Sequence, residues 1–237
     1  MDEEVVKKVF RNELKRLNGA KHERIIELYG ISLDIEKQTF YLVMEFANNG
    51  TLREYLKKNN LEWPEKIRLA SQIAEGMSYL HNIDIIHRDL TTENILIHNE
   101  NAKISDFGLS RNLLSMAANS HNDVVGKIPF IDSRKLEVGE NYLYGKKSDT
   151  YSMGVLMWEI SSNGRPPFSD DKNPVSLMKK IIKKSREAPV PGTPYQYIDL
   201  YSKCWDHEPD KRPSMKQILD QLNSLEVNPK YDDCSPG

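Results

Sequence analysis

The sequence has few cysteines and no long apolar run. Among its 237 residues, only Cys204 and Cys234 are cysteines, too few for the disulfide framework of a small secreted domain. No apolar stretch approaches the roughly 20 residues that a membrane-spanning helix needs, and the acidic start MDEEVVKK is unlike a signal peptide. We therefore expect a cytoplasmic protein without a membrane partner.

The chain also lacks an excess of either charge. Its 33 lysines and arginines nearly balance 35 aspartates and glutamates, for a formal net charge of −2, which argues against a nucleic-acid partner. Hydrophobic residues make up 38% and charged residues 29%, as in a globular chain. The length suits one domain with two lobes.

A third absence concerns glycine. The 12 glycines form no glycine-rich phosphate-binding loop ahead of IIHRDLTTENILIHNENAKISDFGLS, residues 85–110. This stretch places acidic and amide side chains at fixed intervals. If it handles a phosphoryl group, the sequence leaves open what holds the nucleotide.

Apolar periodicity predicts an α+β fold in which a small first part, residues 1–47, precedes a mostly helical part, residues 48–227. We expect Thr51 to cap a short helix at the start of the second part. The last residues, 228–237, are typical of a disordered tail. The other expected elements are a helix at 4–17, strands at 25–34 and 38–46 around a polar turn at 34–37, a hairpin at 95–105, and helices at about 63–81, 148–161, 174–184, 195–204 and 214–226.

Two acids and an amide flank the expected hairpin: Asp89, Asn94 and Asp106. Because a hairpin holds its two ends near each other, the loop that enters it and the loop that leaves it should lie together. Carboxylate and amide oxygens could ligate a hard cation such as Mg²⁺. A carboxylate left off the metal could accept a proton from a hydroxyl nucleophile. The pattern is compatible with phosphoryl transfer.

A plainer interpretation is that Asp89 and Asp106 are ordinary loop acids and that Asn94 caps a turn. That interpretation would suit a lone HRD or DFG tripeptide. Here HRDLxxxN and DFG occur in order, separated by a hairpin of suitable length. Their joint occurrence favours a functional arrangement over chance.

With these motifs the sequence resembles the protein kinase family over nearly the whole chain. The segments CWDHEPDKRPSM and MGVLMWEI are similar to the tyrosine-kinase-like group. The resemblance implies a two-lobed fold, with a truncated small lobe of one helix and two strands, and it implies ATP and Mg²⁺ as cofactors. By the same resemblance Asp89 orients the acceptor hydroxyl and takes its proton, while Asn94 and Asp106 ligate magnesium.

The resemblance also gives a role to the residue before the catalytic aspartate. Arg88 is similar to the arginine that pairs with a phosphate on the activation segment, residues 109 to about 130. Ser110, Ser115 and Ser120 are available acceptors in this segment. Each of them also suits a plain surface position.

In the small lobe, FRNELKRL looks like the C helix of the family, with Glu13 in the ion-pair position. The segment YLVMEFANNGTL resembles the last small-lobe strand and the hinge. Met44 is then the gatekeeper, and backbone groups of Glu45 and Ala47 meet the adenine edge. Leu96 closes the adenine slot from below.

In the large lobe, KSDTYSMGVLMWEI resembles the segment whose aspartate, here Asp149, accepts backbone N–H bonds from the catalytic loop. Four further residues match an apolar stack that links the two lobes, although each would also serve as core packing: Leu17, Leu28, His87 and Phe107.

The first departure from the family concerns the nucleotide lysine. In the family it lies well upstream of the C-helix glutamate, but only twelve residues precede Glu13. Lys7 and Lys8 leave too little room for a strand, a turn and the start of a helix. The expectation is a truncated kinase with impaired transfer, or a pseudokinase.

The second departure from the family lies at the end of the activation segment. Asp132, Ser133 and Arg134 stand where the family usually has Ala-Pro-Glu, and the usual glutamate pairs with an arginine like Arg212. Arg134 opposite Arg212 would be a like-charge contact, unless Asp132 or Glu137 takes over.

The third departure concerns which type of residue accepts the phosphate. Thr91 stands where serine/threonine kinases usually carry lysine, and Glu93 does not match the arginine-bearing loops of tyrosine kinases. The similarity to the tyrosine-kinase-like group favours Ser and Thr as acceptors, with Tyr as the alternative.

Two functions therefore stay open. The first is transfer of the ATP γ-phosphate to a protein substrate, and the second is a kinase-fold scaffold that binds a protein partner without catalysis. An unrelated metal-dependent hydrolase is disfavoured because the order and spacing of the motifs match across the chain. The sequence sets no oligomeric state.

Overall fold

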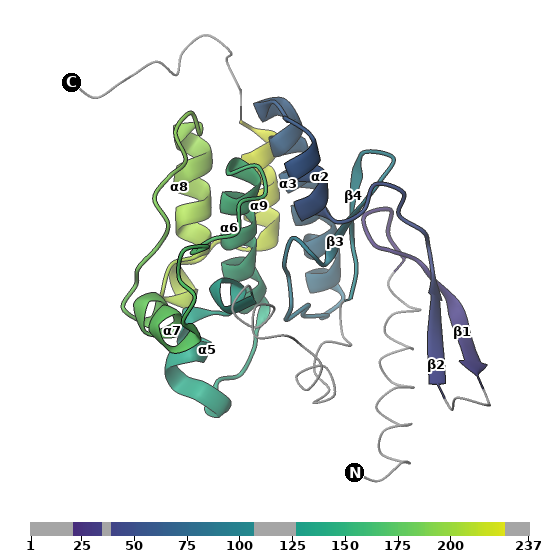
Figure 1. Ribbon diagram of the computed structural model, residues 1–237, viewed down its shortest axis with the longest axis horizontal. Helices are drawn as coiled ribbons and strands as arrows, with labels where there is room; N and C mark the ends of the chain where they lie inside the picture. The colour runs from purple at the N-terminus through teal and green to yellow at the C-terminus, as the bar shows by residue number, and fades with distance from the viewer. Residues whose placement is uncertain (1–20, 35–38, 107–126, 226–237) are drawn as a thin grey trace.

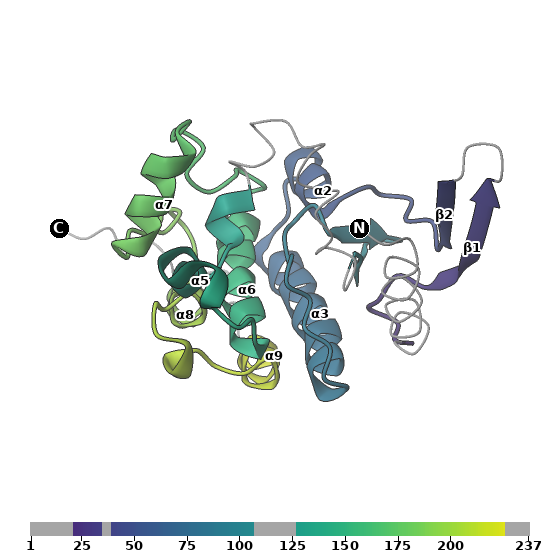
Figure 2. The same cartoon turned by 90° about the horizontal axis from the view of Figure 1, so that it is seen from below.

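A computed structural model describes residues 21–34, 39–106 and 127–225 (Figure 1). Within these ranges the fold is α+β, as predicted, with two antiparallel hairpins and mostly helical structure after them. The first hairpin lies at one end of the molecule and the later helices at the other, in both views (Figure 2). The helix expected at 4–17, the turn at 35–37 and the tail at 228–237 lie outside the described residues.

The first hairpin pairs β1 (Leu28–Asp34) with β2 (Thr39–Met44). The strand expected at 25–34 begins at Leu28 because the residues before it pair elsewhere. Ile25 forms a parallel bridge with Ile104, and the Ile26 N–H donates to the Ile104 carbonyl at 2.9 Å. This bridge attaches the first part of the chain to the second hairpin.

Helices α2 (Leu52–Lys58) and α3 (Trp63–Asn82) follow. Thr51 caps α2 as predicted: its side chain accepts from the Glu54 N–H, and the Glu54 side chain accepts from the Thr51 N–H. This capping box satisfies backbone donors that the first helical turn leaves open. Helix α3 confirms the element expected at 63–81, and its apolar face is fully buried: Leu69, Ile73, Met77 and Leu80.

The second hairpin pairs β3 (Ile95–His98) with β4 (Asn101–Ile104), as predicted. Ile95 and Ile97 point into the core, whereas Leu96 lies on the half-buried face. The segment before α2 adds to the hairpin, because the Ile97 N–H donates to the Gly50 carbonyl at 2.8 Å. The hairpin therefore sits between α3 and the segment that leaves β2.

After the second hairpin, the described residues are mostly helical. Helix α6 is buried from Ser148 to Ser161, and its buried residues include the two acids Asp149 and Glu159. Helix α5 (Ser133–Val138) and three short 3₁₀ turns were not expected, and the predicted helices are confirmed with ends shifted by up to three residues. Their bounds are α6 (Lys146–Ser161), α7 (Pro174–Ile182), α8 (Tyr195–Cys204) and α9 (Met215–Asn223), and the 3₁₀ turns are η1 (Ile128–Phe130), η2 (Gly139–Asn141) and η3 (Pro209–Lys211).

Among the described residues, no helix combines the length and apolar character needed to cross a membrane. Cys204 lies buried on α8, and burial raises the pKa of its thiol well above the ordinary value.

A buried ion pair joins α5 to the loop before α9. Arg212 Nη1 and Nη2 donate to Asp132 Oδ2 and Oδ1 at 2.6 and 2.8 Å, and both side chains are fully buried. The Tyr142 hydroxyl donates to the same carboxylate at 2.6 Å. Arg134 instead pairs with Glu137 at 2.6 Å. The like-charge contact between Arg134 and Arg212 is therefore absent, and Asp132 takes the place of the usual glutamate.

We predict that Arg212→Met destabilises the chain strongly. The substitution leaves the Asp132 carboxylate buried without its cation, which costs about 3–5 kcal/mol in free energy of unfolding. Arg134→Met is the matched control, because it breaks an exposed pair and should cost less than about 1 kcal/mol. Urea unfolding of both variants measures the difference, and equal losses would contradict the assignment.

The same pair predicts a pH dependence. Burial alone would raise the pKa of Asp132, but hydrogen bonds and the charge of Arg212 hold that pKa below its ordinary value. A carboxyl with a lowered folded-state pKa contributes stability above its unfolded pKa, about 3.9, and loses it as the pH falls through the folded value. The stability gap between wild type and Arg212→Met should therefore shrink below about pH 4, in unfolding curves from pH 3 to 7.

Candidate active site

Asp89 and Asn94, which the sequence predicts to be catalytic-loop residues, contact each other directly. The Asn94 amide nitrogen donates to the Asp89 backbone carbonyl at 2.7 Å and to Asp89 Oδ2 at 3.0 Å. These two bonds fix the amide plane of Asn94. Its nitrogen faces Asp89, so its oxygen points away from Asp89. One carboxylate and one oriented amide oxygen therefore share a small region of the loop.

The loop that leaves the second hairpin meets this pair through Ser105. Its N–H and its hydroxyl both donate to the Asn94 carbonyl, each at 2.9 Å, and its own carbonyl lies 3.0 Å from His87 Nε2. Asp106 follows directly, with an exposed side chain and a positive φ of 57°. The two turns thus lie side by side, as the sequence predicts.

His87 connects the two turns in one tautomer. It is fully buried, and this burial lowers its pKa, so the ring is neutral near pH 7. A neutral ring has one donor and one acceptor. Nε2 then donates to the Ser105 carbonyl, and Nδ1 accepts from the Asp89 N–H at 3.3 Å. Of the four residues expected in an apolar stack, His87 is buried with these polar contacts and Leu28 is half-buried at the start of β1. Leu17 and Phe107 lie outside the described residues.

Asp149 at the start of α6 holds the loop from below. Its Oδ1 accepts from the Arg88 N–H at 2.8 Å, and its Oδ2 accepts from the His87 N–H at 2.9 Å, which confirms the prediction. His81 at the end of α3 adds a third contact, with Nε2 2.8 Å from Oδ2. Arg88 has a positive φ of 73°, a strained conformation for a residue with a side chain. The buried carboxylate stabilises this turn.

A second buried acid supports the following residues of the loop. Glu159 on α6 accepts from Arg53 Nε at 2.6 Å and Nη2 at 3.2 Å, and from the Thr92 hydroxyl at 2.9 Å. Arg53 also pairs with Glu93. Burial raises the pKa of Glu159, and Arg53 and Thr92 oppose that shift. Helices α2 and α6 are therefore joined to the loop between Asp89 and Asn94.

The donor set fits magnesium better than a metal held by the protein alone. Among the described residues, no three His, Cys, Asp or Glu side chains gather closely enough to hold an ion. The Asn94 oxygen and the Asp106 carboxylate would supply two hard oxygen ligands. Mg²⁺ typically keeps waters and substrate phosphates beside one or two such ligands.

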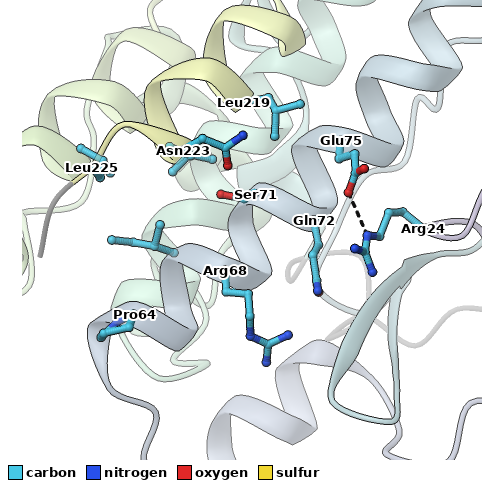
Figure 3. A pocket seen from close by; sticks show the side chains of 11 residues that line it. Arg24, Pro64, Arg68, Ser71, Gln72, Glu75, Leu219, Asn223 and Leu225 are labelled. Carbon is cyan, nitrogen blue, oxygen red and sulfur yellow. Dashed lines mark hydrogen bonds and ion pairs between the residues drawn. The ribbon is translucent and has the colours of Figure 1, made fainter.

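Two cavities differ in their relation to this cluster. A narrow one of about 20 Å³ lies beside Asp89 and Lys127. A larger one of about 640 Å³ lies between α3 and α9 (Figure 3), where Arg24 pairs with Glu75 at 2.9 Å and Arg68 donates to the Glu100 carbonyl at 3.1 Å. Because its arginines are already engaged in holding the fold, we assign the chemistry to the loop cluster.

A family model described as protein tyrosine and serine/threonine kinase matches residues 1–222. The chain belongs to this protein kinase family. Its two small sheets and mostly helical content are the kinase fold with few strands.

Several kinases share about a third of the sequence. A putative serine/threonine-protein kinase/receptor of Acanthamoeba polyphaga mimivirus is 34% identical over 221 residues, which is 91% of this chain and 13% of that protein. Mitogen-activated protein kinase kinase kinase 7 of Drosophila melanogaster is 33% identical, over 92% of this chain and 32% of its own length. Fer-related kinase 1 of Caenorhabditis elegans is 31% identical, over 91% and 54%. The chain thus spans between about an eighth and about half of these relatives.

In this kinase chain, the residues expected at the adenine edge lie at the end of β2, on the segment that follows it, and on β3. Met44 ends β2 and is 40% exposed. The Glu45 N–H donates to the Glu27 carbonyl at 2.8 Å, and the Glu45 carboxylate pairs with Lys103 at 2.7 Å. Leu96 forms an isolated bridge with Thr51. Because the Glu45 N–H is already bonded to Glu27, the Glu45 carbonyl is the backbone group that would be left for an adenine. Ala47, two residues further on, is half-buried. Glu13 lies outside the described residues.

Sequence reasoning missed one charged neighbour of Asp89. Lys127 Nζ lies 3.1 Å from Asp89 Oδ2, although 37 residues separate them in the sequence. No local motif marks this lysine, since its spacing from HRD depends on the length of the intervening segment. His81 was missed for a similar reason, because it reads as the last turn of an amphipathic helix.

We predict that Asp149→Asn loosens the catalytic loop. An amide cannot accept all three hydrogen bonds, so the change should cost about 2–3 kcal/mol in free energy of unfolding. Exchange of the His87 and Arg88 amide hydrogens should accelerate at least about tenfold. Asp84→Asn, the same change at an exposed carboxylate that pairs with Lys146, is the control for mass-spectrometric or NMR exchange. Unchanged protection at His87 and Arg88 would contradict the anchoring role.

Proposed function

We propose that this chain transfers the γ-phosphate of ATP to Ser or Thr hydroxyls of a protein substrate, with Tyr as the alternative acceptor, in cytoplasmic signal transduction. The observation that carries the proposal is the direct contact of Asp89 with Asn94, beside the turn that bears Asp106. Membership of the kinase family supports it.

In the proposed reaction, Asp89 binds and orients the acceptor hydroxyl. The hydroxyl oxygen forms a bond to the γ-phosphorus as the bond from that phosphorus to the β–γ bridging oxygen breaks, and ADP leaves. The hydroxyl proton passes to the Asp89 carboxylate. Asn94 engages one oxygen of this carboxylate, Oδ2, so Oδ1 is the atom we assign to the hydroxyl.

Asn94 and Asp106 would hold Mg²⁺, which when bound neutralises charge on the phosphate oxygens. The adenine would meet the backbone of Glu45 and Ala47 beside Met44, above Leu96. Arg88, exposed next to Asp89, would pair with a phosphorylated residue of the activation segment. The acceptors Ser110, Ser115 and Ser120 and the C-helix Glu13 lie outside the described residues.

We further propose that transfer by these 237 residues is slow. Phosphoryl transfer depends on preorganised charge, and one missing donor costs about two to three orders of magnitude in rate. In these 237 residues, only twelve precede Glu13, which we expect to be too few for the glycine-rich loop and the nucleotide lysine. Binding of ATP would then rest mainly on the hinge and on magnesium.

A scaffold function is the second candidate, and the first hairpin favours it. Large apolar side chains of β1, β2 and the segment after them are exposed, including Tyr29 at 64% and Phe46 at 79%. Exposed apolar groups that cluster on one element are typical of interaction surfaces. A pseudokinase would bind its protein partner there without turnover.

We predict that Asp89→Asn abolishes transfer and preserves nucleotide binding. Loss of the base should lower the transfer rate by about 10²–10⁴-fold, whereas Mg·ATP affinity should stay within about threefold. Calorimetry measures binding, and transfer of labelled phosphate to mixed Ser, Thr and Tyr peptides measures activity.

Asp220→Asn is the matched control, because Asp220 is an exposed acid of α9 that pairs with Lys216. Turnover retained by Asp89→Asn would refute the assigned base. Mg·ATP binding without any transfer in wild type would favour the scaffold, and no binding at all would reject the nucleotide site.

A further inference from the structure

A lysine from outside the catalytic loop shares one carboxylate oxygen with Asn94. Lys127 Nζ lies 3.1 Å from Asp89 Oδ2, and Asn94 Nδ2 lies 3.0 Å from the same atom. Both donors therefore engage the oxygen that we do not assign to the acceptor hydroxyl. The side chains of Lys127 and Asp89 are 36% and 25% exposed, so a substrate can still reach them.

The backbone beside Lys127 is fixed by buried packing. Lys127 immediately precedes η1, whose three residues Ile128, Pro129 and Phe130 are all buried. The Phe130 carbonyl accepts from the Ser152 hydroxyl of α6 at 2.8 Å. Helix α6 also carries Asp149, which anchors the catalytic loop. Lys127 and Asp89 are thus positioned by the same buried helix.

The nearby position Thr91 cannot supply a charge to the reacting atoms. Its side chain is buried, and among the described residues its hydroxyl has no hydrogen-bond partner. Thr91 is therefore directed into the protein rather than toward the Asp89 carboxylate. Arg88 is exposed, and its N–H rather than its side chain makes the described contact with Asp149.

We propose that Lys127 is the cation that binds the transferred phosphoryl group and holds Asp89 in its catalytic orientation. This inference rests on the proposed kinase function. An acceptor hydroxyl bound at Asp89 Oδ1 places its target phosphorus within a few ångströms of the carboxylate. An ammonium 3.1 Å from Oδ2 then faces the γ-phosphate oxygens and stabilises the charge that they carry during transfer. ADP has no γ-phosphate and gains nothing from this contact.

The difference between ATP and ADP gives the test. Lys127→Met removes the charge and keeps the length of the side chain. In the full chain with Mg²⁺, calorimetry should show ATP affinity lower by about tenfold and ADP affinity unchanged within twofold. The peptide transfer rate at saturating ATP should fall by about 10²-fold. Lys127→Arg retains the charge and should recover most of the preference for ATP over ADP.

Lys216→Met is the matched control, since Lys216 forms an exposed pair with Asp220 on α9 and should change neither affinity. Thermal unfolding confirms that each variant is folded. If wild type binds both nucleotides and Lys127→Met weakens them equally or not at all, the role of Lys127 is overturned while the kinase proposal stands. If wild type binds neither nucleotide, the proposed function fails and this inference fails with it.

Discussion

The buried carboxylate of Asp149 is the interaction on which the site depends. It accepts two backbone N–H groups of a turn in which Arg88 has a positive φ. A buried carboxylate needs such donors, because burial without them is costly, and the strained turn needs the carboxylate. Each therefore stabilises the other. His81 adds a donor from α3, so the two longest helices and the catalytic loop share one hydrogen-bonded centre.

Direct hydrogen bonds join the turn at His87 to the second turn, at Ser105. Neutral His87 bonds the Ser105 carbonyl, and Asn94 accepts from Ser105. The β3–β4 hairpin keeps the two loops close, and its inward-facing isoleucines are fully buried. Asp89 and Asn94 therefore lie beside the turn that bears Asp106, although none of the three belongs to the hydrophobic core.

Much of this arrangement follows from the sequence, because it depends on short-range patterns. The capping box at Thr51 and the period of the α3 residues fix those elements locally, and the hairpin length brings the turn at Asp89 close to the turn at Asp106. Long-range charge pairs are different. The sequence offers both Asp132 and Glu137 as possible partners of Arg212 and does not decide between them; Glu137 pairs with Arg134 and Asp132 reaches Arg212, since the choice depends on how α5 packs. Helix α5 itself is only six residues long, too short for a clear period.

Asp132 and Lys127 illustrate one rule about how such a fold tolerates change. A buried arginine such as Arg212 requires an anion at a point in space, and a neighbouring position of the same segment supplies it. The requirement does not specify which residue of the segment carries the charge. By the same argument, the Asp89 carboxylate attracts a cation, and Lys127, which immediately precedes η1, supplies it although 38 positions separate the two residues. Thr91 and Arg134 depart from the family's motifs, yet Asp132 supplies an anion to Arg212 and Lys127 supplies a cation to Asp89.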